Sequence, residues 1–134
     1  MAGDRPPPDP SAVRTRRWDD PPRRGDGTRI LVCRYRPRAL AKADETWDEW
    51  IRALAPSPAL HAAYRGKGQP PIDVDEYRRR YLVEMAEEPA RRALRALRAR
   101  LAAGEHVTLL CSSACTDAAR CHRSFLRDLL FAPA

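Results

Sequence analysis

Residues 107–123 read VTLLCSSACTDAARCHR and carry three of the four cysteines of the chain. The apolar run at residues 107–110 is typical of a buried strand, and Cys111 follows it directly. A short polar loop with Cys115 comes next, and then an apparent helix start with Cys121 and His122. The stretch therefore predicts a strand–loop–helix unit that gathers soft metal ligands and nucleophiles at one end of a strand.

A second strand is expected at residues 28–35, where Ile30, Leu31 and Val32 form a near-continuous apolar run. Such a run is typical of a strand covered on both faces. The fourth cysteine, Cys33, ends it. Because a long helical crossover separates the two strands, we expect them to be parallel. If they are neighbours, all four thiols lie at one edge of one sheet.

The remaining pattern indicates an α/β fold, a small three-layer α/β/α arrangement with a short, mainly parallel sheet. A further short strand is expected at residues 13–18. Thr46 and Glu49 resemble a capping box, which predicts a helix over residues 46–54 with Trp47 and Trp50 on its apolar face. Other helices are expected at residues 58–64 with Ser57 as cap, at residues 73–85 with Asp73 as cap, and at residues 90–103, ended by Gly104. Asp117 is expected to cap a last helix.

Length and composition bound the class of protein. The chain of 134 residues fits one domain, expected at residues 13–134 after a disordered, proline-rich tail at residues 1–12. No apolar stretch is long enough to span a bilayer, and the N-terminus lacks a signal pattern, so we expect a cytoplasmic protein without a membrane partner. In that compartment, cysteines are more often thiols or metal ligands than disulfides.

The formal net charge of +7 invites anionic partners. Of the 25 basic residues, all but Lys42 and Lys67 are arginine, and they are spread along the chain. The basicity is therefore weak evidence for a nucleic-acid partner.

The cysteines suggest two kinds of chemistry. Cys33, Cys111, Cys115, Cys121 and His122 supply enough soft ligands for a metal, with zinc or iron favoured over an iron–sulfur cluster or haem. Alternatively, Cys111 or Cys121 acts as a nucleophile with His122 as its base. That reading rests on adjacency alone, because neighbours on a helix point about a third of a turn apart and are not expected to touch. Cys33 and Cys111 could also be small core residues.

A second group of candidates binds an anion. Arg34, Arg36 and Arg38 alternate along an extended segment and project to one side. With Arg123 at the facing helix start, and with Tyr35 in the pocket lining, they could hold a phosphate or carboxylate. The alternative is a solvated edge in an arginine-rich protein.

Several blocks together resemble the family called domain of unknown function 488 (YeaO-like). They are GDGTRILVCRYRPRALAK, WIRALAPSPAL, EYRRRYLVEM, VTLLC and CHRSFL, and the resemblance covers about residues 13–130. The resemblance implies a small three-layer α/β fold and supplies no activity. Cys33 stands where the family pattern commonly has Asp, and Cys115 lies in a longer loop, which is typical of a thiol-rich branch.

Three functions remain open from the sequence. The first is an enzyme-like domain whose Cys/His/Arg site binds a small anionic molecule, with or without a metal. The second is a nucleic-acid or nucleotide-binding module with structural cysteines. The third is a redox-sensing or structural metal-binding domain. An exposed sheet edge would also allow a homodimer.

Overall fold

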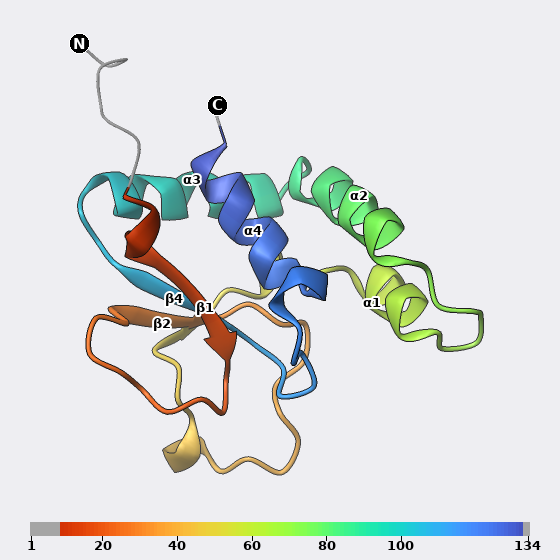
Figure 1. Ribbon diagram of the computed structural model, residues 1–134, viewed down its shortest axis with the longest axis horizontal. Coiled ribbons are helices and arrows are strands. Elements are labelled where there is room, and N and C mark those ends of the chain that lie inside the picture. Colours follow the sequence, from red (N-terminus) through yellow and green to blue (C-terminus); the bar gives the residue numbers. More distant parts are fainter. Residues whose placement is uncertain (1–8, 133–134) are drawn as a thin grey trace.

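The computed structural model describes residues 9–132, which form four parallel strands and four α-helices (Figure 1). The sheet has the order β1-β4-β2-β3, and every neighbouring pair is parallel. The α/β class and the parallel sheet predicted from the sequence are confirmed. The strands are β1 (Val13–Arg17), β2 (Thr28–Leu31), β3 (Glu49–Trp50) and β4 (Val107–Cys111).

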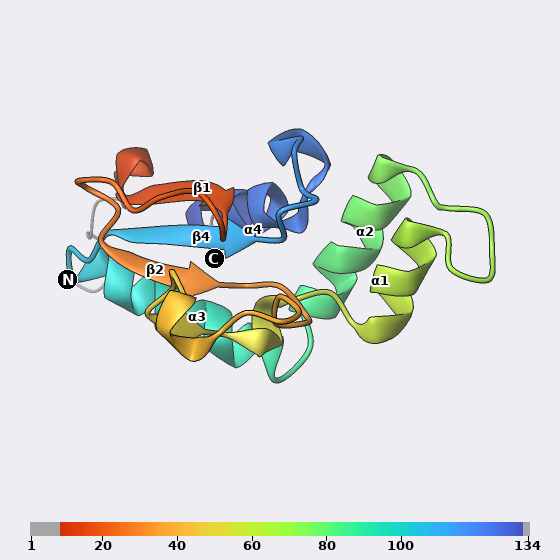
Figure 2. The ribbon, with the colours of Figure 1, turned by 90° about the horizontal axis from the view of Figure 1, so that it is seen from below.

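The helices are α1 (Pro58–Arg65), α2 (Val74–Met85), α3 (Ala90–Ala102) and α4 (His122–Phe131). Two of the predicted caps are present: the Ser57 hydroxyl accepts the Leu60 N–H at 3.1 Å, and the Asp73 carboxylate accepts the Glu76 N–H at 2.8 Å. In Figure 2 the labelled strands point toward α1 and α2, which lie beyond the carboxyl ends of the strands. Residues that follow β2 and β4 therefore meet these helices.

Alternate side chains of the strands face two different layers. Ile30, Val32 and Leu109 belong to the main core with residues of α2, α3 and α4. On the opposite face, Leu31 and Leu110 pack with the cysteines and with three tryptophans. The face of the sheet with Leu31 and Leu110 is not covered by an α-helix. The segment between β2 and β3, with its short 3-10 turn Lys42–Asp44, covers it.

The prediction of a helix over residues 46–54 is wrong. This segment forms β3 and a 3-10 turn, Arg52–Leu54. The Asp48 N–H donates to the Arg29 carbonyl at 2.7 Å and the Ile51 N–H to the Leu31 carbonyl at 3.0 Å, so β3 completes the edge of the sheet. The indole N–H of Trp50 donates to the Cys33 carbonyl at 2.8 Å. These tertiary bonds outweigh the local helix pattern, in a segment whose Trp, Thr and Ile also suit a strand.

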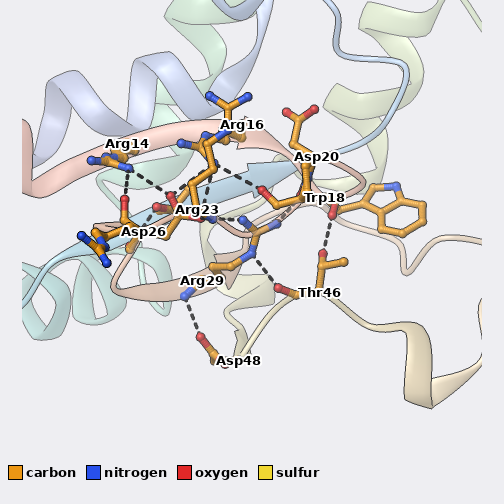
Figure 3. A network of polar contacts seen from close by, with 12 residues as sticks. Arg14, Arg16, Trp18, Asp20, Arg23, Asp26, Arg29, Thr46 and Asp48 are labelled. Carbon is orange, nitrogen blue, oxygen red and sulfur yellow. Dashed lines mark hydrogen bonds and ion pairs between the residues drawn. The ribbon is translucent and has the colours of Figure 1, made fainter.

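A buried ion-pair network fixes the loop between β1 and β2 (Figure 3). Asp26 is only 4% exposed and lies 2.8 Å from the Arg29 guanidinium, with Arg14 at 3.3 Å and Arg16 at 3.2 Å. Arg29 is itself buried and also donates to the carbonyls of Asp20 and Thr46. The two buried charges, Asp26 and Arg29, are thus paired and hydrogen-bonded, so removing either one would leave the other buried and uncompensated.

The two ends of the domain differ in detail from the sequence predictions. Of the tail expected at residues 1–12, residues 1–8 lie outside the described residues, and Asp9 caps the short turn Pro10–Ala12. Asp117 caps a 3-10 turn, Ala118–Arg120, and not the last helix. The N-cap of α4 is Cys121, in extended conformation. Within residues 9–132, no helix has the length and hydrophobicity needed to cross a membrane.

Candidate functional site

Three thiols converge where β4 ends and α4 begins. The Sγ atoms of Cys111, Cys115 and Cys121 all lie within 4.8 Å of one another, with Cys111 and Cys115 only 3.4 Å apart. Cys111 and Cys121 are buried, whereas Cys115, on the connecting loop, is partly accessible. All three are free thiols. We call this group the three-thiol cluster.

His122, in the first turn of α4, lies beside two members of the three-thiol cluster. Its Nε2 lies 2.7 Å from the carbonyl oxygen of Val32. Because a carbonyl can only accept, Nε2 carries the proton, and the lone pair of a neutral ring is on Nδ1. That Nδ1 lies 3.8 Å from the Sγ of Cys111 and 3.9 Å from the Sγ of Cys121.

The expectation that Cys121 and His122 do not touch is therefore wrong. Cys121 has φ −111° and ψ 142°, so it is the extended residue before the helix and does not follow helical spacing. This backbone conformation turns its side chain toward the imidazole of its neighbour.

Hydrogen bonds between the sulfur atoms shift the pKa values of the three thiols in different directions. The pKa of Cys115 is lowered, first by hydrogen bonds from Cys111 and Cys121 and further by the positive charges of His122 and Arg123. The pKa of Cys111 is raised by its hydrogen bond with Cys115 and by burial, and the pKa of Cys121 is raised by its hydrogen bonds with Cys111 and Cys115 and by burial. Cys115 is thus the thiol that ionises first.

The fourth cysteine lies in the same apolar group but outside the three-thiol cluster. The Sγ of Cys33 donates to the Tyr35 carbonyl at 3.1 Å. Burial raises the pKa of its thiol to about 11. Cys33 therefore lies at the same edge of the sheet as the other three thiols and lines the same cavity, as predicted, but its sulfur is not among the donor atoms that lie within 4.8 Å of one another.

A cavity of about 320 Å³ opens onto the cluster. Its lining includes Cys33 and the three-thiol cluster with His122, and α1 and α2 supply residues that the sequence analysis did not assign to the site: His61, Tyr64, Arg65 and Tyr77. Tyr64 and Tyr77 stack with ring centroids 3.9 Å apart. The sequence predicted helices close to α1 and α2, but not that they lie beyond the strand ends.

A second cavity, of about 810 Å³, adjoins the first, and we call it the basic groove. Arg34, Tyr35, Arg36 and Arg38 line it, as do Arg65 and Lys67. Arg34 donates to the Pro56 carbonyl at 2.9 Å, and Arg36 is paired with Glu45 at 2.8 Å.

Arg123 is placed differently from the other predicted anion ligands. It is 5% exposed and is not among the residues that line either cavity. Its Nη2 donates to the Cys115 carbonyl at 3.2 Å, and its Nε and Nη1 have no hydrogen-bond partner among the described residues. Arg123 thus supports the loop that carries Cys115 and does not face the groove.

Comparison with known proteins assigns the chain to a family. Residues 13–133 match a family described as the active DUF488-N3 subclade, DUF488-N3a, and the chain belongs to this family. A curated relative is the uncharacterized protein YeaO of Escherichia coli (strain K12), 37% identical over 75 residues. That match covers 56% of this chain and 63% of the relative. No solved structure matches the chain.

Proposed function

We propose that this domain is an enzyme-like, metal-dependent pocket that binds a small anionic molecule beside a zinc ion. The ligands of the ion are Cys111, Cys115, Cys121 and the Nδ1 of His122. The observation that carries the proposal is the convergence of three thiols and one imidazole lone pair on the floor of a cavity.

The spacing of the donor atoms suits a tetrahedral ion. Ligand atoms about 2.3 Å from a zinc ion at tetrahedral angles lie about 3.8 Å from one another. The distances are 3.4 Å for Cys111–Cys115, 3.8 Å for Cys111–His122 and 3.9 Å for Cys121–His122. The His122 nitrogen is not among the donor atoms that all lie within 4.8 Å of one another, so the loop that carries Cys115 would have to adjust for one ion to contact all four donors.

The surroundings of His122 also favour a metal ligand. Histidines that bind metals usually donate their second ring N–H to a carboxylate or backbone carbonyl, which fixes the tautomer and the ring orientation. The bond from Nε2 to the Val32 carbonyl meets this requirement. Tyr81 packs edge-on against the ring, with centroids 5.5 Å apart, and restricts it further.

The position of Cys115 supports a reactive site over a purely structural one. Cys111, Cys121 and His122 are each at most 4% exposed, but Cys115 is on the loop that faces the cavity. An anion that entered beside Arg34 and Arg65 would meet the ion on the Cys115 side. If the anion displaced Cys115, the most accessible of the four ligands, the ion held by Cys111, Cys121 and His122 would act as a Lewis acid toward it.

The test is metal content and affinity in matched variants. Protein purified without chelator under reducing conditions is analysed for zinc, and the zinc-free form is titrated with zinc in competition with a chromogenic chelator. Wild type and Cys33→Ser are expected to bind stoichiometric zinc, whereas Cys111→Ser and Cys121→Ser lose it. Equal zinc binding by Cys111→Ser and wild type would refute the proposal.

A redox role is the second candidate, and one distance favours it. The 3.4 Å between the sulfurs of Cys111 and Cys115 leaves a short approach to a disulfide bond. Mass spectrometry after mild oxidation separates the two functions. A Cys111–Cys115 disulfide that forms equally fast with and without zinc favours the redox role, and protection by zinc favours the metal site.

A further inference from the structure

We propose that the basic groove binds single-stranded nucleic acid, so that the anionic ligand of the cysteine cavity is a nucleotide unit of that strand. The second half of this inference rests on the function proposed above. The first half concerns the groove alone and is argued from its charge, its aromatic residue and its connection to the cavity.

The groove is cationic and largely unneutralised. Arg34, Arg36, Arg38, Arg65 and Lys67 line it, and no Asp or Glu is among its lining residues. Of these five, only Arg36 has an ion pair within residues 9–132. Arg38, Arg65 and Lys67 are exposed and free to pair with phosphates.

The groove also offers an aromatic face. Tyr35 is 58% exposed, which is unusual for so large a side chain, and its ring meets His61 edge-on at 5.4 Å. An exposed ring among arginines is the arrangement on which bases of a single strand stack, without selection for sequence. A simple phosphate site would not require it.

The groove and the cysteine cavity share their walls. Cys33, Arg34, His61, Arg65 and Ser112 line both. A strand whose phosphates contact Arg38 and Lys67 in the groove can therefore place its next phosphate at Arg65, which also lines the cysteine cavity. This continuity argues that the groove delivers the ligand to the proposed metal site and is not an independent surface.

Fluorescence anisotropy with a labelled oligonucleotide of about 12 nucleotides, within the range of single-strand site sizes, tests the groove. We expect binding that weakens about 20-fold between about 50 and 200 mM salt, as three phosphate contacts imply for a single strand. The triple variant Arg38→Ala/Arg65→Ala/Lys67→Ala should lose this binding, and Tyr35→Ala should weaken it about 10-fold.

The control is a charge-matched triple variant on α3, Arg91→Ala/Arg92→Ala/Arg95→Ala, which removes exposed arginines far from the groove in sequence and is expected to bind like wild type. Equal losses in both triple variants would overturn the inference, because they would show a diffuse charge effect. Duplex DNA or a mononucleotide binding as tightly as the single strand would also overturn it.

Zinc content measured on the same samples separates the two proposals. A groove variant that keeps zinc and loses the oligonucleotide supports both. Wild type that holds zinc but binds no oligonucleotide removes the groove inference and leaves the metal site intact. Oligonucleotide binding without any zinc removes the metal site and leaves the groove.

Discussion

The Nε2–H of His122 donates to the carbonyl oxygen of Val32 at 2.7 Å, and this single bond joins the first turn of α4 to the end of β2. It directs the Nδ1 lone pair toward Cys111 and Cys121. The fold thereby prepares one nitrogen and three sulfur donors before any ligand arrives, which lowers the entropic cost of forming a metal site.

The first prediction concerns that imidazole. His122→Gln removes the nitrogen donor and should weaken zinc binding. Loss of a residue that only hydrogen-bonds to a ligand costs about 10- to 100-fold in metal affinity, and loss of the ligand itself should cost more. The measurement is chelator competition. His61→Gln is the matched control, because His61 lines the same cavity outside the cluster, and it should leave zinc affinity within a few-fold of wild type. Equal losses in the two variants would contradict the assigned ligand.

The second prediction links the metal to stability. A ligand that binds only the folded state stabilises it by about 2.7 kcal/mol at a free concentration 100 times its Kd. Zinc should therefore raise the thermal midpoint of wild type and of Cys33→Ser, and a chelator should reverse the increase. The Cys121→Ser variant should show no such shift. A zinc-induced shift that persists in Cys121→Ser would place the metal elsewhere.

The third prediction concerns Asp26 and pH. Burial raises the pKa of Asp26, but hydrogen bonds from Arg23 and Arg29 and the charge of Arg16 outweigh it, so the folded-state pKa lies below 3.8. A carboxylate with a lowered pKa contributes stability above its unfolded pKa and loses it as the pH falls through the folded value. Asp26→Asn should cost about 3 kcal/mol at pH 7.

The pH dependence itself provides the control for Asp26. Because the variant lacks this carboxylate, its free energy of unfolding should fall less than that of wild type between about pH 5 and pH 2. Asp75→Asn, at an exposed site in the first turn of α2, should follow wild type. Chemical denaturation at several pH values measures the difference, and parallel curves for Asp26→Asn and wild type would disprove the network's role.

The fourth prediction concerns the backbone at Gly27. Its φ is +63°, and a Cβ added there would lie 2.0 Å from the His106 carbonyl oxygen. Gly68 has φ +72° but open space around it. Left-handed backbone costs an L-residue about 1–2 kcal/mol at either position. Gly27→Ala should therefore be clearly more destabilising than Gly68→Ala in denaturant unfolding, and equal effects would refute the close approach.

The sequence predicted the parts of the fold that depend on local signals. The apolar strands, the caps at Ser57 and Asp73 and the end of α3 near Gly104 follow from patterns of a few residues. The helix predicted around Trp50 was wrong because the structure of this segment depends on pairing with β2, and local periodicity carries no information about that pairing. Its helical spacing and its strand-favouring residues gave conflicting indications, and the open sheet edge decided between them.

In the candidate site, too, local signals predicted some features, and others depend on the tertiary structure. The closeness of Cys111, Cys115 and Cys121 was predictable from a strand end followed by a short loop. The contact of His122 with Cys121 was not, because it depends on the extended conformation of the N-cap residue. Arg123 was expected to face the anion site, but its guanidinium donates to the Cys115 carbonyl and supports the loop that carries Cys115. His61 and Tyr64 lacked any local signal for a site.

The most direct test is X-ray absorption at the zinc edge on the zinc-loaded protein. We expect three sulfur scatterers at about 2.3 Å and one nitrogen at about 2.0 Å in wild type and in Cys33→Ser, and no such zinc shell in Cys111→Ser. A first shell of oxygen and nitrogen alone, or a spectrum unchanged in Cys111→Ser, would contradict the claim that the three-thiol cluster and His122 form the metal site.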